Sequence, residues 1–421
     1  MDRDDSTVSS DYVALAPGER TIELLALEAS SRIQMLPLIT TATFYKGAPP
    51  IAFLEERVKD IVKANPWLCG KVAKRSGKYV IVCDTAPVPS LFVALRPHEV
   101  PIHNGMSLRE VGSLIQKKLE PPKAPDAIQF KVALVPDDRT PDDAFCLVVS
   151  LSHTLGDGAT YYALLNMLDA AAGGAKPPVR PLQPIRHKIT PHEEVALMGK
   201  AEVGFTTTPG YVCGFLSSVC RGCCVAKAVP QAWSVNERWL AQQKERGASE
   251  SDVGFVSSND VLTSWFFRSV RATVGLMAVN LRGRAGMSAS ADDAGNYESL
   301  LLYRPADYAG PAMLRRSIAT MRRGADPPTK LPGCCSLCCA HMAIVSNWAT
   351  FHNGLDLPGC EQIVHYPMMA SAPVNLDLSS AVIFRPREGE LAIWSLSPRM
   401  KSNNQVMERD GPLGEPMGAP G

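Results

Sequence analysis

A buried strand followed at once by a histidine loop constrains the fold of this chain more than any other feature. Phe145–Leu151 is an almost unbroken apolar run, which is typical of a strand covered on both faces of a sheet. His153 follows it, and Asp157 can act as the N-cap of a helix that begins near Gly158. The sequence therefore predicts a buried strand, a short loop that carries a histidine, and a helix.

Periodic apolar patterns before and after this loop predict further helices and strands. Residues 51–64 have helical spacing, whereas residues 128–134 alternate with period two, as in a half-buried strand. The other predicted elements are helices at 261–270 and 314–322, strands at 274–280 and 299–303, and hairpins at 71–83 and 382–395.

These elements form two halves of similar size, so the predicted fold class is mixed α+β, with a sheet and flanking helices in each half. The expected boundaries are a first domain at 1–175, a crossover at 176–250 and a second domain at 251–400. Residues 401–421 are polar and rich in glycine and proline, which predicts a disordered tail.

Composition excludes several classes of protein. The chain has 421 residues, and its net charge of +1 shows no basic excess that would favour a nucleic-acid partner. The first residues contain no apolar segment typical of a secretory signal, and no run is long enough for a membrane span. A cytoplasmic protein is expected, with peripheral membrane association left open.

The histidine of the loop is the first candidate for chemistry. A neutral imidazole can take a proton from an alcohol, an amine or a thiol, which is the task of a general base. Gly156 and Gly158 lack side chains and leave room beside the ring of His153. Spacing alone does not distinguish a general base from a histidine that satisfies a hydrogen bond at a strand–helix corner.

The loop and several later segments resemble one family. Residues 153–158 read H-T-L-G-D-G, the H-x-x-x-D-G form found in the CoA-dependent acyltransferase superfamily with the chloramphenicol acetyltransferase fold. The chain is most similar to BAHD-type members, and the resemblance spans about residues 50–400. The other segments that resemble the family, in the same order, are Asn65–Val72, Ser258–Trp265, Val279–Tyr297, Ser346–Trp348 and Val382–Leu396.

The resemblance implies roles for individual residues. His153 would be the general base, and Asp157 would support the loop by pairing with Arg282 or Arg284. The oxyanion donor would come from Trp348 or Ser346, although Trp348 could equally be a core aromatic and the arginines could be solvated. The residues expected to contact substrate are Gly158, Asn296 and Thr154, with backbone satisfaction as the alternative for Asn296.

The resemblance also implies the substrates. Acyl-CoA would be a co-substrate, no cofactor or metal would be bound, and a small molecule would supply the accepting hydroxyl or amine. A lipophilic acceptor becomes more plausible if the chain contacts a membrane. The expected active site lies in a channel between two chloramphenicol acetyltransferase-like domains of a monomer.

Two departures keep other functions open. The D-F-G-W-G segment of BAHD enzymes is absent from the corresponding residues 352–360, which gives weight to a catalytically silent binding or scaffold protein. Ser152 stands where condensation domains usually have a second histidine. A condensation-type enzyme that uses carrier-bound acyl groups is nevertheless a third candidate.

Clustered cysteines are the remaining unusual feature. Cys220 and Cys223, and likewise Cys335 and Cys338, have the spacing of half a zinc knuckle. Lipidation near a membrane is an alternative. Tyr211–Ala226 could lie in a membrane interface, but the favoured interpretation is a loop buried against the protein.

Overall fold

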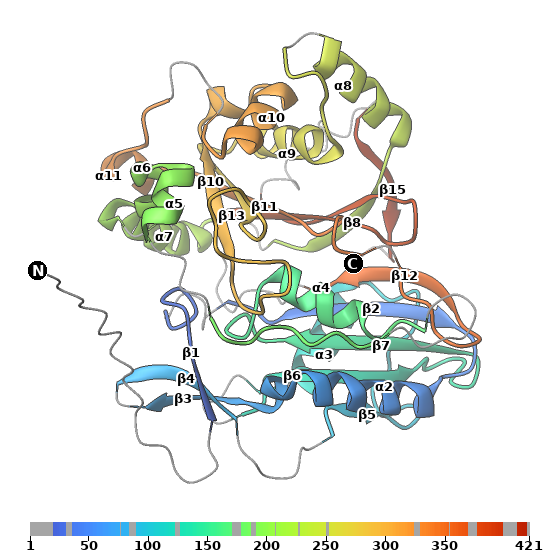
Figure 1. Cartoon of the computed structure of the whole chain (residues 1–421). Helices are drawn as coiled ribbons and strands as arrows, with labels where there is room; N and C mark the ends of the chain where they lie inside the picture. Colours follow the sequence, from blue (N-terminus) through green and yellow to red (C-terminus); the bar gives the residue numbers. More distant parts are fainter. Residues whose placement is uncertain are drawn as a thin grey trace, which may run out of the picture.

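The computed structural model contains two stacked halves, each with a sheet and helices (Figure 1). It describes residues 20–30, 36–75, 77–83, 90–122, 127–170, 178–186, 191–206, 208–225, 228–249, 252–323, 329–352, 354–368, 377–398 and 411–418.

The first half is built on a five-stranded sheet in the order β12-β2-β7-β6-β5. The apolar run forms β7 (Ala144–Leu151), which is central and pairs antiparallel with both β2 and β6, so the predicted buried strand is confirmed. The other strands are β2 (Ile39–Lys46), β5 (Phe92–Ala94), β6 (Phe130–Pro136) and β12 (Glu361–Pro367).

Helices and a small sheet complete this half. The predicted helix is α2 (Ile51–Ala64), and the predicted hairpin is formed by β3 (Lys71–Arg75) and β4 (Lys78–Cys83). In Figure 1, α4 lies between the five-stranded sheet and the second half. The remaining elements are β1 (Arg20–Glu23), which pairs with β4, the short helix η1 (Pro66–Cys69), α3 (Leu108–Lys118) and α4 (Gly158–Asn166).

The second half is built on a seven-stranded sheet in the order β10-β9-β11-β13-β14-β8-β15. Helices α8, α9 and α10 lie above this sheet in Figure 1. The strands are β8 (Pro230–Val235), β9 (Val274–Asn280), β10 (Glu298–Tyr303), β11 (Met342–Asn347), β13 (Leu378–Phe384), β14 (Ala392–Leu396) and β15 (Leu413–Met417), and the helices are α8 (Glu237–Ser249), α9 (Ser258–Ser269), η2 (Pro305–Tyr308) and α10 (Pro311–Thr320).

The segments that join the halves correct several expected boundaries. Strand β8 lies in the seven-stranded sheet, so the crossover is shorter than 176–250. Strand β12 pairs with β2 of the first half, although residues 251–400 were assigned to the second. The predicted disordered tail is wrong for residues 411–418, because β15 pairs with β8. The hydrophobic pattern of a strand predicts the strand itself, but it does not indicate which sheet that strand joins.

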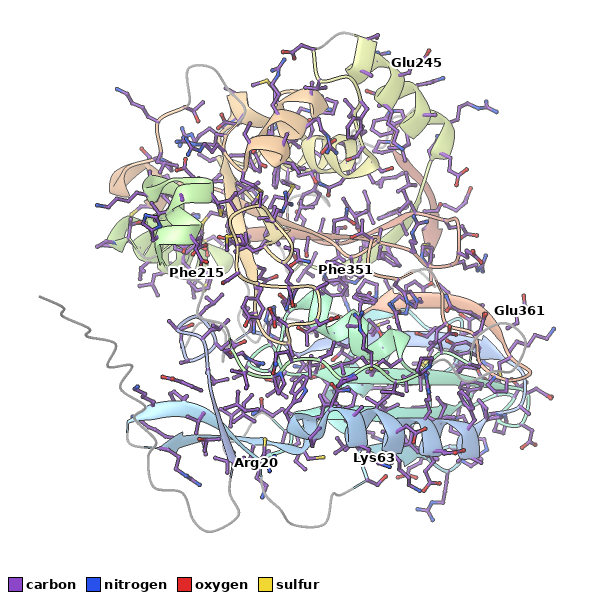
Figure 2. All side chains as sticks on the ribbon, viewed as in Figure 1. Arg20, Lys63, Phe215, Glu245, Phe351 and Glu361 are labelled. Atoms are coloured by element: carbon purple, nitrogen blue, oxygen red, sulfur yellow. The ribbon has the colours of Figure 1, made fainter. Side chains whose placement is uncertain are left out.

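The cysteine-rich segment is helical, so the interpretation as a buried loop is wrong. It forms α7 (Pro209–Gly222), which follows α5 (Pro191–Met198) and α6 (Lys200–Phe205) and contacts α11 (Cys334–Cys338). Phe215 on α7 is partly exposed and lies at the side of the molecule in Figure 2. Within the described residues, no three His, Cys, Asp or Glu side chains are placed to hold a metal ion, and no helix there is long and apolar enough to cross a membrane.

A continuous core joins the two halves. The largest buried apolar cluster extends from the first sheet and α4 to Trp348, Val382 and Trp394 of the second half. Phe351 lies between the halves in Figure 2. Leu155, which follows β7, therefore lies in the same packed region as Trp348, which follows β11.

Candidate active site

His153 lies directly after β7, where the chain leaves the sheet and turns into α4. Its side chain is 16% exposed, which leaves part of the ring accessible. The Nδ1 atom lies 2.8 Å from Asn296 Oδ1, and the Nε2 atom lies 3.8 Å from Glu298 Oε1. The second distance is too long for a hydrogen bond, so the Nε2 face of the ring is not occupied by this carboxylate.

Asn296 determines which nitrogen of His153 carries the proton. The Asn296 Nδ2 donates to the carbonyl oxygen of His153 at 2.8 Å and to Glu28 Oε1 at 3.1 Å, and both of these oxygens can only accept. The amide oxygen must therefore face Nδ1, which donates its hydrogen. In the neutral imidazole Nε2 then has the lone pair, which is the state required for a base.

Two buried charged residues that the sequence did not suggest hold Asn296 in place. Glu28 is fully buried and accepts from the backbone N–H of Asn296 at 2.8 Å and from Arg186 Nε at 3.0 Å. Arg186 also donates to the carbonyl oxygens of Leu155 at 2.8 Å and Ala294 at 2.6 Å. This ion pair thus joins the histidine loop to the loop before β10, which carries Asn296.

Glycine is required beside this ion pair. Gly295 has a φ of +137°, and a Cβ atom there would lie 2.9 Å from Arg186 Nε and 3.0 Å from Glu28 Oε1. A side chain at this position would displace the pair and, with it, Asn296.

Asp157 pairs with Arg282, and Arg284 does not make this contact. Arg282 NH1 lies 2.7 Å from Asp157 Oδ2, and the two side chains are 4% and 2% exposed. Asp157 also caps α4 by accepting from the Thr160 N–H, and it accepts from the Tyr297 N–H. Arg284 instead donates to the carbonyl oxygen of Asn280, which corrects the expectation that either arginine could serve. The carboxylate of Asp157 therefore secures the loop and does not touch the His153 ring.

Trp348 and Ser346 form a hydrogen-bonded pair at the end of β11. The indole Nε1–H donates to Ser346 Oγ at 2.9 Å, and Trp348 is 8% exposed. Gly158 leaves room for the indole, because a Cβ there would lie 3.3 Å from Nε1. The only N–H of the indole is therefore used, whereas the hydroxyl hydrogen of Ser346 is available to another acceptor.

If Ser346 supplies the oxyanion donor that the resemblance implies, Ser346→Ala should lower kcat for acyl transfer by about 100-fold, because that preorganised donor is lost. Trp348→Phe should have a smaller effect, since it removes only the contact that orients Ser346. Thiol release from acyl-CoA measures both variants, with the exposed Ser249→Ala as the matched control. An unchanged rate in Ser346→Ala would exclude this hydroxyl as the donor.

Thr154 and Asn296 were also expected to contact substrate, and both are buried. Thr154 is 4% exposed, and its contact with substrate stays a prediction. Asn296 is 3% exposed and its side-chain amide donates to the carbonyl oxygen of His153, as the alternative of backbone satisfaction expects, while its contact with substrate stays a prediction. Glu28, Arg186 and Glu298 were missed because none of them belongs to a recognisable motif. The position of Glu298, two residues after the Gly-Asn pair, was the one visible signal.

A second group of polar aromatic side chains lies along α4. His352 and His365 have ring centroids 4.4 Å apart, and Tyr162 OH lies 3.1 Å from His365 Nε2. His352 Nδ1 lies 3.0 Å from Asn166 Oδ1, while His352 Nε2 is buried without a hydrogen-bond partner among the described residues. Burial lowers the pKa of His352 to about 4 and that of His365 well below its usual range. Both rings are therefore neutral in the folded protein.

Acid should destabilise the chain partly through His352. Below pH 6.5 the unfolded chain gains a proton on this residue while the folded chain does not until about pH 4. The free energy of unfolding is therefore expected to fall by about 1.4 kcal/mol per pH unit in this window, or about 3 kcal/mol in total. Urea unfolding of His352→Gln from pH 7.5 to 4.5 should lack this contribution, whereas the exposed His98→Gln should keep it. An identical pH slope in His352→Gln and the unaltered chain would contradict this origin.

Comparison with known proteins supports the fold. Sequence comparison finds no matching family model and no matching curated protein. Among solved structures, F. sporotrichioides TRI101 complexed with coenzyme A and T-2 is 16% identical with a TM-score of 0.56 and covers 91% of this chain and 97% of its own. The F. graminearum TRI101 complex with coenzyme A and deoxynivalenol is 16% identical with a TM-score of 0.57 and covers 92% and 98%.

A condensation domain has the same arrangement. The first condensation domain of the CDA synthetase is 14% identical with a TM-score of 0.52 and covers 92% of both chains. This chain has the chloramphenicol acetyltransferase-like fold. The expected fold is thereby confirmed across both halves.

Proposed function

We propose that the chain is an acyltransferase that moves an acyl group from acyl-CoA to a hydroxyl or amine acceptor, with His153 as general base. The observation that supports this most directly is the hydrogen bond of His153 Nδ1 to the fixed amide oxygen of Asn296. It leaves the lone pair on Nε2, which no described side chain contacts at hydrogen-bond distance.

The proposed reaction follows from this lone pair. His153 Nε2 removes the proton of the acceptor as its oxygen or nitrogen attacks the thioester carbonyl. The tetrahedral intermediate carries a negative oxygen, and Ser346 Oγ–H would donate to it. When the intermediate collapses, the carbon–sulfur bond breaks, and His153 returns the proton to the thiolate. The base then regains its neutral form without a cofactor.

The acyl donor is the part of the proposal that the similar solved structures support. Both TRI101 structures contain coenzyme A, and a likeness in fold to them favours acyl-CoA as the donor. The likeness to a condensation domain favours a second candidate, an acyl group carried as a thioester on a carrier protein. Both donors present the same thioester to His153, so the chemistry at the site is shared.

The test is thiol release by the full chain with acetyl-, hexanoyl- and palmitoyl-CoA, with and without acceptors, together with calorimetric binding of CoA. Turnover above the uncatalysed rate, with CoA bound, is the expected result. No CoA binding together with turnover of a carrier-bound acyl thioester would favour the second candidate. If the chain neither binds CoA nor turns over any acyl donor, acyl transfer is contradicted. The scaffold alternative then remains.

A further inference from the structure

We infer that the acceptor is an amine that is positively charged in solution, and that the Glu298 carboxylate binds it beside His153. This inference rests on the proposed acyl transfer and decides between its two classes of acceptor. It assigns the substrate class from the position of Glu298 beside His153 and from the absence of a hydrogen-bond donor to its carboxylate among the described residues.

Glu298 occupies the acceptor side of the catalytic imidazole. It is the first residue of β10, two residues after Asn296, and its Oε1 lies 3.8 Å from His153 Nε2. Its side chain is 27% exposed and that of His153 is 16% exposed, so neither group is fully enclosed by protein. A group bound to one of them lies within reach of the other.

Two other carboxylates near His153 already have arginine partners. Asp157 lies 2.7 Å from Arg282, and Glu28 lies 3.0 Å from Arg186. No hydrogen-bond donor within the described part of the chain contacts the Glu298 carboxylate at hydrogen-bond distance. Glu298 lies instead 3.8 Å from His153, and no arginine of the described residues lies within ion-pair distance of it.

A carboxylate in this position calls for a cationic ligand. Burial raises the pKa of Glu298, the nearby Asp157 raises it further, and His153 and Arg282 oppose the shift. A partly desolvated carboxylate without a donor is costly, and a charge-assisted hydrogen bond from an ammonium group offsets this cost. An alcohol would offer only one weaker, neutral hydrogen bond.

Amide formation from a protonated amine releases two protons, and Glu298 and His153 can each accept one of them. A protonated amine must lose two protons to become an amide, whereas an alcohol loses one to become an ester. The ammonium gives its first proton to Glu298, which releases it to solvent, and the neutral amine attacks the thioester. His153 takes the second proton and delivers it to the departing thiolate. The products are an amide, free CoA thiol and one proton in solution.

The experiment uses acetyl-, hexanoyl- and palmitoyl-CoA with three acceptors: hexylamine, 1-hexanol and 6-amino-1-hexanol. Mass spectrometry of the last product distinguishes an amide from an ester within one molecule. We expect the amide, and we expect Glu298→Gln to lower kcat/KM for hexylamine at least tenfold relative to 1-hexanol, mainly through a higher KM. Glu245→Gln is the matched control, because this exposed residue lies at the outer edge of the second half (Figure 2).

Each other outcome counts against the inference or against its basis. Ester as the main product, or an equal fall for both acceptors in Glu298→Gln, would overturn the amine assignment. Thiol release by hydrolysis alone, without an acylated acceptor, would also count against it while leaving acyl transfer chemistry in place. No thiol release from any acyl-CoA would instead contradict the proposed function.

Discussion

Replacing His153 with alanine should lower kcat for acyl transfer between about 100-fold and 10,000-fold, the contribution usual for a general base. Without the Nε2 lone pair, the attacking group must lose its proton to water, and the thiolate must leave without a proton donor. Binding of acyl-CoA should change little, because the imidazole acts on the acceptor. The measurement is thiol release at saturating acyl-CoA, with CoA binding followed in parallel.

The matched control for this variant is His98→Ala. His98 is an exposed histidine that contacts Asp138 2.9 Å away, at the surface. The variant His98→Ala should leave kcat unchanged. This result would separate the loss of a particular imidazole from the loss of any histidine. Equal rates for His153→Ala and the unaltered chain would refute the catalytic role of His153, provided that both proteins show the same thermal unfolding.

Removal of Arg282 should cause the largest loss of stability. Arg282 donates to Asp157, to Asn280, and to the carbonyl oxygens of Asp293 and Gly295. The variant Arg282→Ala leaves the Asp157 carboxylate buried without its counter-charge, which typically costs about 3–5 kcal/mol. Urea unfolding at neutral pH measures this difference.

Two further variants test the reason for this loss. Arg316→Ala removes an exposed ion pair with Asp252 and should cost under about 1 kcal/mol. In the Arg282→Ala background, Asp157→Asn should restore part of the stability, because it removes the buried charge. If the double variant were less stable than Arg282→Ala alone, the uncompensated charge would not be the cause.

The local parts of the site could be predicted from the sequence because each depends on neighbouring residues. The apolar run of β7 and the N-cap at Asp157 lie within a few residues of His153. Strand burial and helix capping are local effects, so they leave a pattern in the sequence. The resemblance of residues 153–158 and of later segments to one superfamily added the fold, which the solved structures support.

The choice between Arg282 and Arg284 could not be made from the sequence. The two arginines are separated by Gly283, whose φ of +68° turns the chain between them. This turn directs Arg282 to Asp157 and Arg284 to the carbonyl of Asn280. Spacing alone treats the two positions as equivalent, whereas the turn and the surrounding packing do not.

The sequence by itself thus determined the histidine, its strand and its helix, because these are adjacent along the chain. Only the tertiary structure decided which groups surround the ring. Glu28 lies 268 residues from Asn296, and Asn296 lies 143 residues from His153, yet hydrogen bonds connect all three. Such contacts depend on how two sheets pack against each other, and no local pattern encodes that packing. The same packing places Glu298 beside the Nε2 atom of His153.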